Sequence, residues 1–224
     1  MKTIMIFLAG LFIAGSLYSE TVKKDQFMIK SFPAEEKSLK VEITKMWKDG
    51  WYPRGLTTDG TDKITVLFIK NGTEMYKDWL IRFSADGTAN TIKQDTLAEI
   101  NAGWMPVDIT IASAKAVSLY LKPKEVIRVW DNVTVTVDMM PITAVSGEYK
   151  KSFYTPSGLF LQSGNPVMLK ILSPVDTSFS YVIRTYPGDD ASVQKGIEQA
   201  SAEGLQPWGI EKSGSEMKVI YFSF

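Results

Sequence analysis

Residues Gly50–Leu56 read GWYPRGL, and two later stretches repeat their pattern, Gly103–Ile109 (GWMPVDI) and Gly204–Ile210 (GLQPWGI). In each, a proline stands three residues after the glycine and an aliphatic residue stands six after it. The glycines at 50 and 103 are 53 residues apart, and those at 103 and 204 are 101 apart, about twice as far. This spacing predicts a degenerate copy near the midpoint, and Phe153–Leu159 (FYTPSGL) keeps the proline and the leucine. The chain therefore carries an internal repeat of about 50 residues.

An alternating apolar segment follows each copy. Positions 14, 16 and 18 after the anchor residue (Gly50, Gly103, Phe153 or Gly204) are apolar in eleven of twelve cases, with no insertion between the anchor and the segment. The twelve residues are Ile64, Val66, Phe68, Val117, Leu119, Leu121, Val167, Leu169, Ile171, Lys218, Ile220 and Phe222. A period of two predicts a strand with one buried face. Because turn residues separate it from the anchor, each anchor begins a predicted β-hairpin.

The segments before the anchors have a different period. Leu39, Ile43 and Met46 precede Gly50 at helical spacing, and Val193, Ile197 and Ala200 precede Gly204 in the same way. We expect helices over 39–48 and 193–203, with the anchor glycine as the left-handed residue that ends each helix. The third copy has the weakest helical pattern, because Ile142, Val145 and Tyr149 surround Gly147, so its helix is expected to be short or irregular.

A further apolar segment before each helix completes the unit as strand, helix and hairpin. The sequence therefore predicts an α+β fold of four βαββ pseudo-repeats, at about 22–70, 76–122, 130–172 and 178–224, with antiparallel sheets and helices on one face. Residues 20–224 would form a single compact body, in which the units form either a ring or two pairs. The predicted core consists of Leu39, Ile43, Met46, Val66, Phe68, Leu119, Leu121, Leu169, Ile171, Ile220 and Phe222.

One unit resembles the small βαββ domains of unknown function that are common in bacteria. The resemblance rests on the helix that ends in Gly-Trp, as at Gly50 and Gly103, and on the hairpin that follows. Those domains usually lack the proline found here at 53, 106, 156 and 207. The resemblance implies a fold, and it carries no catalytic residues to transfer.

The composition narrows the range of functions. The 224 residues include no His and no Cys, which removes thiol nucleophiles, disulfides, Cys/His zinc sites and an imidazole base. The 25 Lys and Arg balance 25 Asp and Glu, so no net positive charge favours a nucleic-acid partner. We expect no cofactor and no metal site.

Residues 1–19 have the outline of a secretory signal peptide. A single cation, Lys2, precedes an apolar run over 4–14, and small residues including Gly15, Ser16 and Ser19 follow. Cleavage would leave a chain that begins between residues 16 and 21, is periplasmic or secreted, and has no integral membrane segment. The alternatives are a buried N-terminal helix and an uncleaved anchor.

Four anchor aromatics are the candidate ligand-binding residues: Trp51, Trp104, Tyr154 and Trp208. Aromatic faces offer broad contact to sugars or peptides at low entropic cost. The alternative is packing in the core or between repeats, because the last copy has Leu205 where Trp51 stands in the first and carries its tryptophan three residues later.

No catalytic residue is assigned. Ser192 and Lys195 match the Ser-x-x-Lys pattern of serine acyltransferases, but its companion motifs are absent, and Ser192 suits the start of a helix. The closest acidic pairs are Asp59 with Asp62, which suits a turn, and Asp189 with Asp190, which suits a helix N-terminus.

These observations favour an exported, non-enzymatic binding or interaction protein, whose partner would be an unidentified protein or glycan of the cell envelope. Duplicated small units create several similar surfaces without any chemistry. The alternative is a carboxylate-only hydrolase acting on envelope glycan, which would need two carboxylates facing one cleft.

Overall fold

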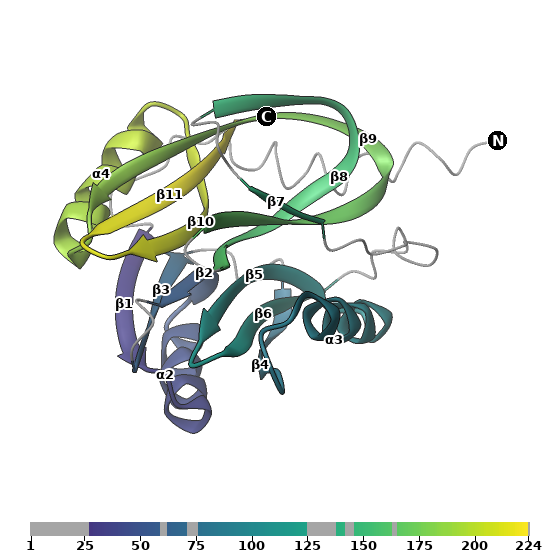
Figure 1. The fold of residues 1–224 in the computed structure, drawn as a ribbon. Coiled ribbons are helices and arrows are strands. Elements are labelled where there is room, and N and C mark those ends of the chain that lie inside the picture. The colour runs from purple at the N-terminus through teal and green to yellow at the C-terminus, as the bar shows by residue number, and fades with distance from the viewer. Residues whose placement is uncertain are drawn as a thin grey trace.

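The computed structural model describes residues 27–58, 62–70, 76–124, 138–141, 146–162 and 165–223. Side chains are described for these residues except within 138–180 and at 222–223. The predicted signal peptide lies outside these residues. The described chain is an α+β fold in which every strand pairing is antiparallel. Three helices lie at the periphery, and the strands lie between them (Figure 1). No helix in the described part of the chain is long and apolar enough to cross a membrane.

Three segments have the predicted order of strand, helix and hairpin. The first unit contains β1 (Phe27–Pro33), α2 (Glu36–Lys48), β2 (Trp51–Thr58) and β3 (Lys63–Lys70). The second unit contains β4 (Tyr76–Phe83), α3 (Ala89–Asn101), β5 (Met105–Ala112) and β6 (Lys115–Pro123). The last unit contains the end of β9 (Asn165–Pro187), α4 (Asp190–Ala202), β10 (Gln206–Ser213) and β11 (Glu216–Ser223). In each, the final strand pairs with both others and so lies in the middle of the sheet.

The helices α2 and α4 lie where the sequence predicts them, over 39–48 and 193–203, but each begins three residues earlier, at Glu36 and Asp190. Leu39, Ile43 and Met46 are the buried residues of α2, so the helical period in the sequence does mark the packed face. Gly50, Gly103 and Gly204 follow the three helices with φ of +82°, +83° and +87°, the left-handed conformation that favours glycine. The residues that follow Gly103 and Gly204 complete the helix ends. The Trp104 N–H donates to the Glu99 carbonyl, and the Leu205 N–H donates to the Ala200 carbonyl. The predicted role of the anchor glycines is confirmed.

The third segment departs from the prediction, and a fourfold βαββ repeat is not confirmed. Here β7 (Asp138–Pro141) is followed by the long strand β8 (Ser146–Gln162), so a strand occupies 146–152, where the third helix was expected. Both halves of β8 pair with the 23-residue strand β9, which also belongs to the last unit, and the two segments share one five-stranded sheet. Glycine at 147 disfavours a helix interior, and the stretch has no continuous apolar stripe that a helix could bury. Pairing with β9 instead satisfies the backbone hydrogen bonds of this stretch.

The recurring prolines mark β-bulges. The register between the hairpin strands shifts between Pro53 and Gly55, between Pro106 and Asp108, between Pro156 and Gly158, and between Pro207 and Gly209. Proline lacks the N–H that a ladder requires, so it is confined to edge strands and bulges. The extra residues are Arg54, Val107, Ser157 and Trp208, each four positions after its anchor. All four hairpins share this bulge.

The hairpin strands differ from the sequence prediction in two respects. First, residues Ile64–Ile69 of β3 are all buried, so both faces of the strand are covered, not one. Second, Gly55 pairs with Leu67, whereas the equivalent Asp108 pairs with Leu119 and Gly209 with Ile220, so the first hairpin has one residue more. A strand that is apolar on both faces gives no signal of such a shift, because every position accepts an apolar residue.

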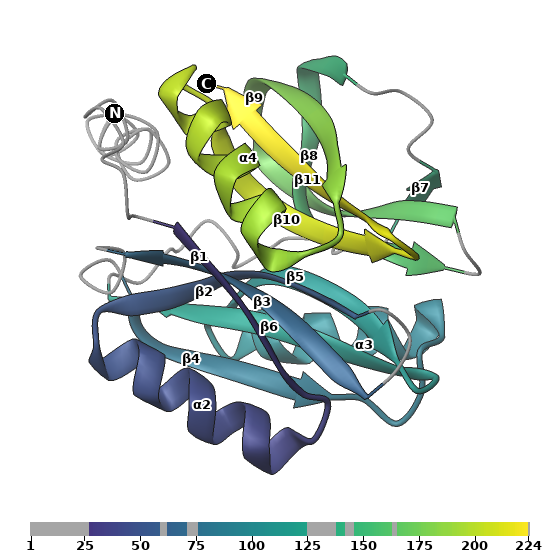
Figure 2. The ribbon, with the colours of Figure 1, turned by 90° about the vertical axis from the view of Figure 1, so that its left-hand side faces the viewer.

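Most of the predicted core is confirmed. Leu39, Ile43, Met46, Val66, Phe68, Leu119, Leu121 and Ile220 are buried, and the ring of Phe32 meets Phe68 edge to face at 6.1 Å. The side chains of Leu169, Ile171 and Phe222 lie outside the described residues. Figure 2 shows α2 and α4 on opposite outer sides, with the sheets between them. The helices therefore cover the outer faces, and the sheets pack together in the middle.

The first strand of each hairpin meets its counterparts in the neighbouring segments. Strand β2 contacts β5 and β10, and β8 also contacts β5 and β10, which closes a ring of four strands. Each of these strands is the edge strand of its hairpin and carries the bulge. We call β2, β5, β8 and β10 the central ring. The sequence left open whether the units form a ring or two pairs, and these contacts describe a ring.

Candidate binding site at the central ring

Strands β2 and β10 lie side by side in the same direction, and β5 meets β2 at the same level. The Arg54 guanidinium lies over the Trp208 ring, 3.5 Å from its centre, and both residues are four positions after their anchors. The Leu56 backbone N–H donates to Asp108 Oδ2 at 2.9 Å, and the Lys212 backbone N–H donates to Thr57 Oγ1 at 2.7 Å. In each contact the partners stand at equal or adjacent positions after their anchors. Antiparallel neighbours would instead pair early positions with late ones.

Two predicted binding residues lie at the same end of this ring. Trp51 and Trp104 are both one position after their anchor glycine, at the start of β2 and β5, and both are half-buried. A lysine from the end of the same hairpin lies over each ring, with Lys70 Nζ 5.2 Å from the centre of Trp51 and Lys122 Nζ 4.9 Å from the centre of Trp104. We call this end of the ring, where the central strands begin, the anchor end.

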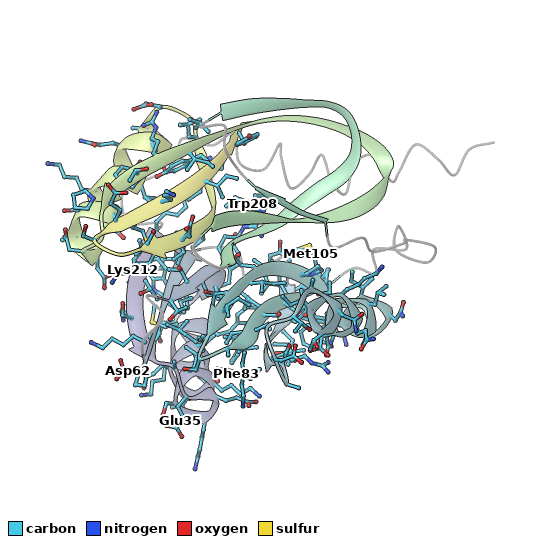
Figure 3. All side chains as sticks on the ribbon, in the orientation of Figure 1. Glu35, Asp62, Phe83, Met105, Trp208 and Lys212 are labelled. Carbon is cyan, nitrogen blue, oxygen red and sulfur yellow. The ribbon has the colours of Figure 1, made fainter. Side chains whose placement is uncertain are left out.

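The other two predicted residues are placed differently. Trp208 is three residues further along its strand, at the bulge, where it stacks with Arg54 and does not extend the row of Trp51 and Trp104. The last unit has the half-buried Leu205 in that row. The side chain of Tyr154 lies outside the described residues. Figure 3 shows Lys212 to the left of Trp208, on the same side of the view as Asp62.

Several buried residues on the ring strands β2, β5 and β10 are polar or charged, which the sequence analysis did not anticipate. Asp108 is 0% exposed, Glu211 1% and Arg54 6%, and the hydroxyl-bearing Thr57 and Thr110 are buried beside them. Thr57, Thr110 and Glu211 all stand seven positions after their anchors, so they lie at one level of three central strands. A polar residue at the same position in three copies is a signal that could have identified this row from the sequence.

Asp108 joins two strands through its carboxylate. Its Oδ2 accepts the Leu56 N–H from β2, and its Oδ1 accepts the N–H of Ile109, the next residue on β5, at 2.8 Å. A Cβ placed on Gly55 would lie 3.1 Å from Asp108 Oδ2 and 3.3 Å from Gly209 Cα, closer than most side-chain contacts. The absence of a side chain at Gly55 therefore lets three central strands meet. Asp108 takes the place of the missing sheet partner of β2.

Glu211 is buried without a comparable partner. Among the described residues, neither carboxylate oxygen has a hydrogen bond. Burial raises the pKa of Glu211 above its ordinary value, and Lys218, opposite it on β11, only partly opposes this effect. A carboxyl group in such a place is favoured in its neutral form.

The other candidates from the sequence have structural roles. Asp189 caps α4, because its Oδ1 accepts the Ser192 N–H at 2.8 Å, and hydrogen bonds from Ser192 hold the pKa of Asp189 below its ordinary value. Asp190 lies in the first turn of the same helix. The backbone carbonyl of the exposed Asp62 accepts the Ala34 N–H at 2.6 Å, and Asp59 lies outside the described residues.

Acidic residues elsewhere are paired with arginines between helix and sheet. Arg82 of β4 binds Asp95 at 2.8 Å and Glu99 at 2.6 Å, both on α3. Arg184 of β9 pairs with Glu203 after α4. In the part of the chain with described side chains, no three acidic residues gather into a group that could hold a metal ion.

Comparison with known proteins adds no assignment, because no family model matches the chain. No curated protein is similar to it in sequence either. The resemblance to small bacterial βαββ domains therefore rests on the residues quoted above.

Proposed function

We propose that this protein is an exported, non-enzymatic binding protein whose ligand-binding surface is the anchor end of the central ring. The observation that carries the proposal is the repeated pair of half-buried tryptophan and lysine, Trp51 with Lys70 and Trp104 with Lys122. Both pairs stand at the same level of adjacent strands. A half-buried aromatic ring has one part fixed by packing and another part available for contact.

The fold supports a surface of this kind. The anchor glycines and the ring contacts place the first residues of β2 and β5 at one end of the ring. Rigid elements hold a recognition surface more accurately than loops do. The expected partner is a protein or glycan of the cell envelope, in keeping with the predicted export.

The alternative, a carboxylate-only hydrolase acting on envelope glycan, has less support. Such an enzyme needs two carboxylates that reach one substrate bond from opposite sides. Asp108 and Glu211 are the acids of the ring interior, but both are almost wholly buried, and Asp108 accepts two backbone N–H groups. A substrate bond could reach neither group without a rearrangement of the ring.

The experiment that tests the proposal is retention of envelope glycans and proteins on the immobilised mature chain. We expect the double variant Trp51→Ala/Trp104→Ala to lose a bound species by at least tenfold, the order of effect that removal of aromatic contacts has at binding sites. Phe83→Leu is the control, because Phe83 is a half-buried aromatic of β4, which is separated from the ring strand β5 by β6. Equal retention by all three proteins would overturn the assignment of the anchor end, and cleavage of a retained glycan would favour the hydrolase.

The predicted export has a separate test. N-terminal sequencing of the chain recovered from the periplasm or the medium should begin between residues 16 and 21. Recovery of the full-length chain from the cytosol would contradict it.

A further inference from the structure

Arg54 is the charged group of the ring for which the described residues offer no acidic partner. Its side chain is 94% buried, since 6% remains exposed, and its only described interaction is the stack on Trp208 at 3.5 Å. A guanidinium keeps its charge, and a buried charge is costly unless it is paired. A buried, unpaired arginine lowers the stability of the fold, so we looked for a role of Arg54 in binding.

The two acids of the ring interior do not pair with Arg54. No ion pair within 4.0 Å joins Arg54 to Asp108 or to Glu211, although their side chains are all described. Asp108 is engaged with backbone N–H groups of β2 and β5. Glu211 stands three positions beyond the level of Arg54 and, as a group favoured in its neutral form, offers less negative charge to it.

The bulge explains how Arg54 comes to lie there. It is the extra residue of the β2 bulge, and such a residue leaves the ladder and has its side chain re-aimed. The bulge residue of β10 is Trp208, so the two irregular positions of adjacent strands face one another. Stacking on Trp208 occupies a face of the guanidinium and leaves the N–H groups at its edge for an acceptor. Trp208 is half-buried and Arg54 keeps 6% of its surface exposed, so the pair lies at the edge of the buried interior and is not fully enclosed by it.

We propose that Arg54, held by its stack on Trp208, is an anion-recognition site that takes a carboxylate or phosphate group of the ligand. The inference rests on the proposed function, because the ligand that contacts Trp51 and Trp104 would also place an acidic group at Arg54. Arg54 lies three residues further along β2 than Trp51. Planar, bidentate pairing with carboxylate or phosphate is the chemistry for which the arginine fork is suited. Lys70 and Lys122 add positive charge to the same end of the ring. The ligand class is thus an acidic one.

The test uses two small probes, glucuronate and inorganic phosphate, titrated at constant ionic strength. The four arginines of the chain, Arg54, Arg82, Arg128 and Arg184, give a simple NMR spectrum of side-chain Nε–H groups, and Arg54→Lys assigns one resonance. We expect a saturable shift of the Arg54 signal with at least one probe. Which probe acts distinguishes a carboxylate-bearing ligand from a phosphate-bearing one.

Variants separate recognition from folding. Arg54→Lys keeps the positive charge but loses the planar guanidinium that can donate two parallel hydrogen bonds. This variant should bind the probe about tenfold more weakly, as expected for the loss of a charge-assisted hydrogen bond. Trp208→Phe keeps a stacking ring and should bind nearly as well as the native chain. Arg184→Lys, at a surface ion pair with Glu203, is the control and should leave probe binding unchanged.

The outcomes distinguish this inference from the proposed function. If neither probe shifts the Arg54 signal, or if Arg54→Lys binds as tightly as the native chain, the anion site is overturned even where Trp51 and Trp104 prove to bind a ligand. If the probes bind at Arg54 but the double tryptophan variant retains every envelope species, the anion site stands and the proposed surface fails.

Discussion

The molecule has two interiors of opposite character. Between helices and sheets the buried residues are apolar, as where Leu39 and Ile43 of α2 are buried with Phe68 of β3 in a common core. Inside the central ring the buried residues include Arg54, Asp108 and Glu211. The difference follows from what each region has to satisfy. A helix brings its backbone hydrogen bonds with it and needs only apolar cover, whereas four edge strands meet without a common ladder and need side chains to satisfy their N–H groups.

The largest expected effect concerns the helix–sheet interior. Phe68→Ala should lower the free energy of unfolding by about 3–5 kcal/mol, because it removes a fully buried ring and leaves a cavity against Phe32. Denaturant unfolding followed by circular dichroism measures the loss. A value below about 1 kcal/mol would mean that this interior carries less of the stability than its burial indicates.

Asp108→Ala tests the polar interior. It removes the acceptor of the Leu56 N–H and should cost about 1–3 kcal/mol, because a buried donor is left without a partner. Asp108→Asn keeps one oxygen and should cost less. The same unfolding experiment measures both variants. An Asp108→Ala variant as stable as the native chain would show that the ring is held by packing alone.

Gly55→Ala tests how closely the central strands approach. The added methyl would lie within 3.3 Å of the Gly209 backbone, which cannot move as a flexible side chain can, and about 1 kcal/mol of destabilisation is expected. Because the contact lies between the first and last units, hydrogen exchange should quicken in β2 and β10 more than in β6. Uniform exchange would place the strain elsewhere.

Glu211→Gln should have the smallest effect and the opposite sign. Burial raises the pKa of Glu211 above its ordinary value of 4.5. At a pH below 4.5 the carboxyl group is protonated in both the folded and the unfolded chain, so its ionisation does not change the free energy of unfolding. As the pH rises above 4.5, the unfolded chain gains by ionising and the native protein loses stability relative to Glu211→Gln. Unfolding free energies compared at acid and neutral pH measure the difference. Glu216→Gln, at an exposed position of the same hairpin, is the control, and a Glu211→Gln variant less stable than the native protein at neutral pH would contradict the prediction.

This comparison also explains what could be predicted from the sequence. The helices α2 and α4 were predictable, because an apolar stripe at 3.6-residue spacing and a terminal glycine are both local signals. The prediction for the third segment was wrong because the strand that begins at Ser146 is fixed by pairing with β9, a partner that lies in the next segment of the chain. Arg54, Asp108 and Glu211 were missed for a related reason. Their positions follow from contacts between units, which no single repeat contains.

The recurring proline was visible in the sequence, but its meaning was not. It appeared as a spacing marker at 53, 106, 156 and 207, and the structure shows the bulge that follows each one. A bulge places its extra residue out of the alternation, so the period-two pattern cannot say where Arg54 or Trp208 points. Candidate binding residues at such positions can be proposed from a sequence only once the bulge is recognised.

Two hydrogen bonds join the first unit to the last unit across most of the described chain, and one of them lies within the central ring. Gln194 Nε2 donates to the Phe27 carbonyl at 2.7 Å across 167 residues, and Lys212 donates to Thr57 across 155. The entropic cost of closing a loop grows only with the logarithm of its length, so these contacts add little to the equilibrium cost of folding. Their effect on the rate is larger, because high contact order slows folding. We therefore expect the contacts between β2 and β10 to form late in folding, after the local hairpins of the first and last units have paired.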